Sequence, residues 1–211
     1  MTIAIDVDDK HERVSPRADE GGAASRRIVA GYGFWIFLLS DIVMFSALFA
    51  SYAVLAKATA GGLSGAQLFD RRTVAMETVF LLLSSYACGF LSFGMSSRRY
   101  LHVFSGAAVT FVLGVAFLSL EFHEFRDMIA LGATPQRSAF LSGFFALVGC
   151  HGIHVTVGLI WLVIMMVQLA MWGFRPVVER RILCFALFWH ALDIIWIMIF
   201  TVVYLMGVAH D

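Results

Sequence analysis

Two pairs of polar residues stand in long apolar stretches of this sequence, each at a spacing that places both members on one face of a helix. His151 and His154 are three positions apart, as are His190 and Asp193, and residues i and i+3 are neighbours on a helix surface. Asp41 stands in a third apolar stretch. Histidine and carboxylate side chains can ligate zinc or iron, pass protons or hydrogen-bond between helices. These five residues are the candidates for a polar seam between packed helices.

Three interpretations of this seam stay open from the residues alone. A haem or metal centre needs several facing histidines, but the other four of the seven lie in the N-terminal tail, at the C-terminus or at the ends of an apolar stretch (His11, His210, His102 and His123). A proton path would run through Asp41, His190 and Asp193, since intramembrane ionisable residues mark such relays. Buried hydrogen bonds that fix the helices, in contact with a lipid or partner subunit, are the interpretation that the residues favour.

Three further carboxylates stand near the ends of apolar stretches. Glu77 begins one stretch, Glu121 ends the next, and Glu124 follows Glu121 by three positions. Four arginines are close to them in the sequence (Arg71, Arg72, Arg126 and Arg137). The pattern indicates a solvated belt of charges at the outer membrane boundary, with a lipid or subunit contact as the alternative.

The composition explains why these polar residues are notable. Of 211 residues, 60% are hydrophobic and 14% charged, whereas soluble domains have about 45–50% apolar and about 25% charged residues. Such an excess indicates a membrane protein. The net charge is zero and no basic stripe occurs, which argues against a nucleic-acid partner. Cys88, Cys150 and Cys184 lack CxxC spacing, so we expect packing residues and neither disulfides nor a thiolate site.

Five apolar segments are long enough to cross a bilayer, which takes about 20 helical residues. The sequence therefore predicts an all-α, polytopic protein with a five-helix transmembrane domain over residues 29–211. The predicted spans are 32–56, 75–96, 102–122, 139–171 and 182–207. Residues 1–28 carry six acidic and five basic residues, which predicts a disordered cytoplasmic tail. No apolar core precedes residue 30, so we expect no cleavable signal peptide.

The distribution of Lys and Arg predicts the orientation. With the N-terminus inside, ten Lys and Arg residues lie on the inner side and five on the outer side. Positive charges favour the cytoplasmic side, so we expect a cytoplasmic N-terminus and a periplasmic C-terminus. Small residues also recur at helical spacing (Ser84, Cys88 and Ser92; Gly106, Thr110 and Gly114), which favours close helix packing over a pore lining.

Five sequence blocks resemble a known family. They are GFWIFLLSDIVMFSALFASYAVL, ETVFLLLSS, LEFHEF, FFALVGCHGIHVTVGLIW and LFWHALDIIWIMIFTVVYLMG, in this order. Together they resemble subunit III of the haem-copper respiratory oxidases across residues 31–208. The cytochrome c oxidase branch usually has seven spans, and this pattern lacks the first two. The segment AFLSGFFALVGCHGIHV and the charged tail are most similar to subunit III of the bo-type ubiquinol oxidases.

This resemblance implies a non-catalytic accessory subunit of a proton-pumping terminal ubiquinol oxidase in a bacterial inner membrane. It implies that haems, copper and ubiquinol belong to partner subunits, and that this chain holds no catalytic residue, metal or cofactor. Expected partners are subunits I, II and IV and phospholipids. Asp41 falls at the family's intramembrane carboxylate, usually Glu in the cytochrome c branch. His151, His154, His190, Asp193 and Glu121 match family positions with structural, lipid-contact or subunit-contact roles.

Two other functions stay open. One is subunit III of a cytochrome c oxidase, which differs in its electron donor. The other, of a different class, is an independent proton channel or transporter that uses Asp41.

Overall fold

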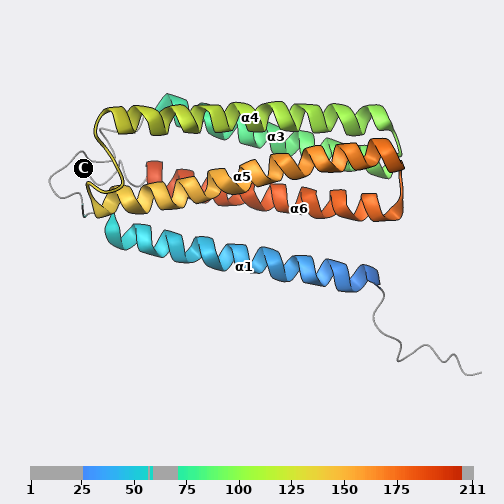
Figure 1. Ribbon diagram of the computed structural model, residues 1–211, viewed down its shortest axis with the longest axis horizontal. Coiled ribbons are helices and arrows are strands. Elements are labelled where there is room, and N and C mark those ends of the chain that lie inside the picture. The colour runs from blue at the N-terminus through green and yellow to red at the C-terminus, as the bar shows by residue number, and fades with distance from the viewer. Residues whose placement is uncertain (1–25, 57, 59–70, 206–211) are drawn as a thin grey trace, which may run out of the picture.

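The computed structural model describes residues 26–56, 58 and 71–205. This part of the chain forms long helices and no strand: α1 (Arg26–Leu55), α3 (Arg71–Ser96), α4 (Tyr100–Ala130), α5 (Ala139–Trp172) and α6 (Pro176–Ile199), which continues as the π-helical η1 (Phe200–Leu205) (Figure 1). Within these described ranges, five helices are long and apolar enough to cross a membrane. The predicted all-α, five-span architecture is confirmed.

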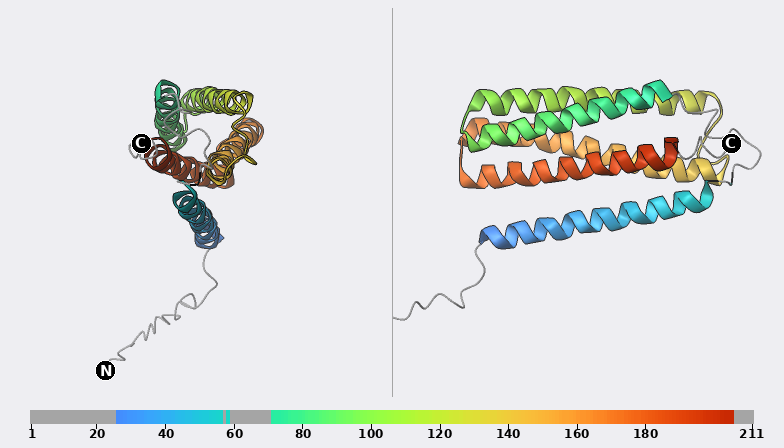
Figure 2. Two further views of the ribbon diagram at one scale, coloured as in Figure 1. Left: turned by 90° about the vertical axis from the view of Figure 1, so that its left-hand side faces the viewer. Right: turned by 180° about the vertical axis from the view of Figure 1, so that it is seen from behind.

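Four of the helices form a bundle and the fifth lies outside it. Viewed along the helices, α3, α4, α5 and α6 occupy the corners of a square, and α1 packs beside it against α5 and α6 (Figure 2). The most apolar window of α1 is only 11% buried, whereas that of α6 is 56% buried. Helix α1 therefore presents most of its apolar surface to the surroundings, whereas α6 is largely enclosed by the other helices.

Several helices extend beyond the spans predicted from hydrophobicity, α4 and α6 among them. Helix α4 continues through Glu121 and Glu124 to Ala130, past the predicted end at 122, and α6 begins at Pro176, ahead of the predicted 182. Proline fits the first turn of a helix because its missing N–H would have no intrahelical partner there. Hydrophobicity identifies only the apolar part of a helix. Backbone hydrogen bonds can continue the helix through the polar residues on either side of that part. Residues 1–25 of the predicted tail and the predicted span end at 207 lie outside the described residues.

Small residues hold α3 and α4 together, as their spacing predicted. The backbone of α3 at Leu91 lies 2.8 Å from the position of a β-carbon at Gly106, so only glycine fits there. Thr110 donates a hydrogen bond of 3.3 Å to the carbonyl of Ser84. Cys88 is fully buried, and all three cysteines are free thiols. The predicted close packing is confirmed at Gly106, Thr110 and Cys88.

Candidate functional site

The structure divides the five residues of the predicted seam into three separate places. Asp41 and His154 meet between α1 and α5. His151 is fully buried inside the bundle. His190 and Asp193 face α3, where they line a groove with Ser85. The expectation of one seam is therefore corrected, because a shared helix face for each pair does not fix which neighbouring helix that face meets.

The first place is the contact between α1 and the bundle. His154 Nε2 lies 4.0 Å from Asp41 Oδ1, and both side chains are about four-fifths buried, being 21% and 17% exposed. His154 Nδ1 lies 2.7 Å from the carbonyl oxygen of Cys150. A carbonyl only accepts hydrogen bonds, so Nδ1 carries the donated proton, and Nε2 is the ring nitrogen outside this hydrogen bond. That nitrogen faces the Asp41 carboxylate.

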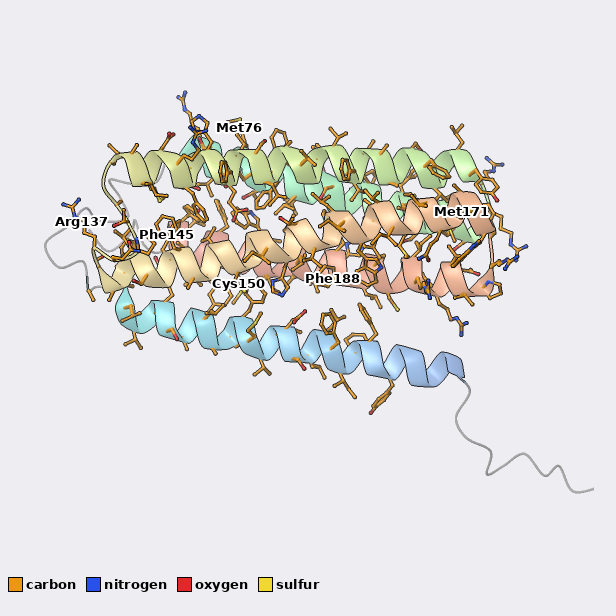
Figure 3. All side chains as sticks on the ribbon, in the orientation of Figure 1. Met76, Arg137, Phe145, Cys150, Met171 and Phe188 are labelled. Carbon is orange, nitrogen blue, oxygen red and sulfur yellow. The ribbon has the colours of Figure 1, made fainter. Side chains whose placement is uncertain are left out.

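Aromatic contacts frame this pair. Phe45 is almost completely buried, and its ring centroid lies 5.3 Å from that of His154. Further along α1, Phe37 stacks on Phe188 of α6 with ring centroids 6.4 Å apart. Cys150 and Phe188 both lie on the side of the bundle that faces α1 (Figure 3). Asp41 is thus held by the same apolar contacts that attach α1 to the bundle.

The second place is the core around His151. Its ring contacts Phe117, Trp196 and Phe45, with centroid distances of 5.9, 5.3 and 6.4 Å. Trp196 in turn donates a hydrogen bond of 3.1 Å from Nε1 to Thr78 Oγ1 on α3. His151 therefore packs as an aromatic ring between α4, α6 and α1. Its position ties three helices together at one depth.

The third place is the groove between α3 and α6. Ser85 Oγ and His190 Nδ1 form a hydrogen bond of 2.7 Å, and Asp193 interacts with the same hydroxyl. The polar trio Ser85, His190 and Asp193 thus joins two helices that are far apart in the sequence. Ser85 was not predicted from the sequence, because a single serine in an apolar span has no periodic signal. Only the facing of α3 against α6 identifies it.

The predicted solvated belt of carboxylates is wrong for two of its members. The side chains of Glu77 and Glu121 are 0% and 4% exposed, so they point into the bundle. Glu77, Glu121 and Glu124 lie within electrostatic range of one another, and Tyr204 of η1 donates a hydrogen bond of 3.2 Å to Glu124 Oε2. The helices continue past the predicted span ends, so these residues occupy helix faces rather than helix ends. Tyr204 was likewise not predicted.

Within the described ranges, no group of three His, Cys, Asp or Glu side chains is arranged to hold a metal ion. His123 and Asp127 do approach each other, with Nδ1 and Oδ2 3.2 Å apart, but both side chains are about two-thirds exposed or more. Some polar side chains bond between helices, as Trp189 does to Ser84 and Trp196 to Thr78.

Comparison with known proteins shows which family this chain belongs to. Residues 18–208 match the family described as cytochrome c oxidase subunit III. The chain belongs to this family. It is 52% identical over 176 residues to the cytochrome bo(3) ubiquinol oxidase subunit 3 of Pseudomonas putida, covering 83% of this chain and 85% of that protein.

Other relatives in the subunit III family are named as subunits of different oxidases. The chain is 43% identical over 175 residues to the quinol oxidase subunit 3 of Bacillus subtilis, covering 83% of this chain and 86% of that protein. It is 38% identical over 192 residues to the cytochrome c oxidase subunit 3 of Bacillus sp. PS3, covering 91% and 93%. The resemblance predicted from the sequence blocks is confirmed.

Proposed function

We propose that the chain is subunit III, an accessory subunit, of a proton-pumping terminal ubiquinol oxidase in a bacterial inner membrane. The observation that carries this proposal is the 52% identity to a protein named as subunit 3 of a cytochrome bo(3) ubiquinol oxidase. Five membrane-crossing helices agree with such a role. In this proposal the haems and copper are bound by partner subunits, which also oxidise the ubiquinol, and this chain carries no redox centre.

The role of the chain in that complex is to stabilise the subunit that carries the haems and copper. In support of a structural role, polar side chains form hydrogen bonds between helices of this chain: Ser84, Thr78 and Glu124 accept from Trp189, Trp196 and Tyr204. Helix α1 offers a long apolar surface, including Trp35, Ile36 and Val43. Subunits I, II and IV and phospholipids are the proposed partners for such surfaces. The proposed orientation places the N-terminus in the cytoplasm and the C-terminus in the periplasm.

Purification of the native complex through an affinity tag on this chain tests the proposal. We expect haem and copper to copurify, and we expect the haems to be reduced by ubiquinol and reoxidised by oxygen. A complex lacking this chain should keep its initial turnover but lose activity faster during continuous turnover. Equal lifetimes and equal proton pumping with and without the chain would contradict the stabilising role.

A second function is supported by the 38% identity to a cytochrome c oxidase subunit 3. It predicts that the tagged complex accepts electrons from reduced cytochrome c and leaves ubiquinol unused. The two donors, given separately to one preparation, decide between the two functions.

A further inference from the structure

A groove on the outside of the bundle runs between α3 and α6 and encloses about 540 Å³. Its lining combines aromatic, small and polar side chains (Leu82, Ser85, Tyr86, Gly89, Phe90, Phe93, His190 and Asp193). Asp193 is only 9% exposed, and its Oδ1 has no hydrogen-bond partner among the described residues. A buried carboxylate oxygen that lines a cavity calls for a donor, because nearly all buried polar atoms are hydrogen-bonded.

The depth of the groove restricts the kind of donor. Ser85 lies near the middle of α3, and Asp193 lies well inside the segment Pro176–Leu205. Phospholipid headgroups lie at the membrane boundaries, outside the ~30 Å hydrocarbon layer. A cationic donor at this depth carries a large insertion cost. The fitting ligand is therefore neutral and lipid-soluble, with a hydroxyl group as the donor.

The walls of the groove restrict the shape of the ligand. Tyr86, Phe90 and Phe93 of α3 contribute aromatic surfaces, against which a flat ring packs favourably. A β-carbon at Gly89 would meet nothing within 4 Å, so the chain itself leaves this part of the groove open. The volume lies within the ~300–1,000 Å³ of small-molecule sites.

The polar end of the groove offers two separate atoms to such a ring. Asp193 Oδ1 is an acceptor without a partner. His190 uses Nδ1 for Ser85, which leaves Nε2 outside that hydrogen bond. A ring with two oxygen substituents can therefore bind Asp193 through one and His190 through the other.

We propose that the groove binds the ring of a quinol, with one ring hydroxyl donating to Asp193 and the ring packed on Tyr86 and Phe90. The isoprenoid tail leaves the open side of the groove into the lipid. This inference rests on the proposed function, which places the chain in an oxidase that uses ubiquinol. It concerns binding alone and assigns no electron transfer to this chain.

Photolabelling of the intact complex tests the site. The complex is purified through a tag on this chain and irradiated with an azido-ubiquinone that is kept reduced. Gly89→Leu adds a side chain at a position where a β-carbon has open space, and Asp193→Leu removes the acceptor with the same number of side-chain heavy atoms. Val112→Phe is the control, because it adds volume on an exposed face of α4.

We expect label on the α3 peptide that contains Tyr86 and Phe90 in the wild type and in Val112→Phe. Both groove variants should lose this label, and the quinone extracted per haem should fall by about one equivalent. Unlabelled ubiquinol should compete with the label, whereas diacylglycerol, which shares the hydroxyl donor, should not. Competition by diacylglycerol alone would assign the groove to a neutral lipid and overturn the proposal.

Label found only in other subunits, with unchanged quinone content in both groove variants, would also overturn it and would indicate a groove covered by a partner helix. Failure of the proposed function gives a different result. In that case the tagged chain would copurify without haem that ubiquinol can reduce, whatever the labelling of α3.

Discussion

The carboxylate of Glu121 on α4 lies directly on the backbone of Gly152 on α5. Its two oxygens are 2.6 and 2.8 Å from the position that a β-carbon at residue 152 would occupy. Glu121 is 4% exposed, so the carboxylate has little room to move aside. Any side chain at residue 152 would therefore have to displace this buried carboxylate, at a point where α4 and α5 lie close together.

Gly152→Ala should therefore destabilise the protein. Overpacking a close contact costs about 1–3 kcal/mol, because the added methyl group must displace a buried side chain or separate two helices. The measurement is the free energy of unfolding of the purified protein in mixtures of detergent and sodium dodecyl sulfate.

Gly149→Ala on the same helix is the matched control, since the β-carbon there would lie 3.8 Å from Phe125, an ordinary contact. We expect it to change the stability by less than about 0.5 kcal/mol. The double variant Glu121→Ala with Gly152→Ala should recover part of the loss, because it removes the side chain that the methyl group displaces. Equal stability of the two glycine variants would show that the Glu121 contact imposes no constraint.

The five helices were predictable because backbone polar groups are costly to expose to lipid. A long apolar segment avoids this cost by forming a helix, which satisfies its own backbone hydrogen bonds. Close helix packing at the small residues of α3 and α4 was predictable too, since small residues at helical spacing permit it. Gly106 shows this directly, because the α3 backbone fills the place of its side chain.

The orientation of Glu77 and Glu121 into the bundle was not predictable from the same signals. Hydrophobicity places a glutamate near the end of a span, but it does not say where the helix ends or how the helix is rotated. Glu121 of α4 lies against Gly152 of α5, and such a contact between two helices cannot be read from the sequence of either helix. The link of Ser85 to His190 was missed for the same reason.

Ser84→Ala tests a hydrogen bond between helices. Trp189 Nε1 donates to Ser84 Oγ at 3.1 Å, and both side chains are buried. Loss of the acceptor leaves the indole N–H unpaired in a dry site. Hydrogen bonds between membrane helices average about 0.6 kcal/mol with a maximum near 1.7 kcal/mol, so we expect a loss in this range, measured by the same unfolding titration.

Ser119→Ala is the control for that substitution. Both serines donate to the carbonyl three residues earlier in their own helix, at 2.7 Å, but Ser119 is exposed. The control should leave stability nearly unchanged. A loss at Ser119 as large as that at Ser84 would assign the effect to the helix backbone and not to Trp189.

Asp41→Ala should leave quinol oxidation and oxygen reduction largely intact, because the Asp41 side chain pairs with His154 at the contact between α1 and α5. We expect a change in stability or in the number of protons pumped per electron, since the variant removes the carboxylate that faces Nε2 of His154. Oxygen consumption and proton release by the reconstituted complex measure both. Asp127→Ala, at a side chain that is 67% exposed, is the control. Complete loss of haem reduction in an assembled Asp41→Ala complex would contradict this expectation.

The orientation of the chain is open to a labelling experiment. Ser97 lies in the turn between α3 and α4, and Gln136 lies in the loop between α4 and α5, both exposed and at opposite ends of α4. Each is replaced by cysteine in a chain whose Cys88, Cys150 and Cys184 are alanine. The excess of positive charge on the Ser97 side favours the cytoplasm. A membrane-impermeant maleimide should therefore label Gln136→Cys in intact spheroplasts and Ser97→Cys only after the membrane is opened. Labelling of Ser97→Cys in intact spheroplasts, with Gln136→Cys protected, would reverse the topology and place Glu77 and Glu121 near the cytoplasmic side.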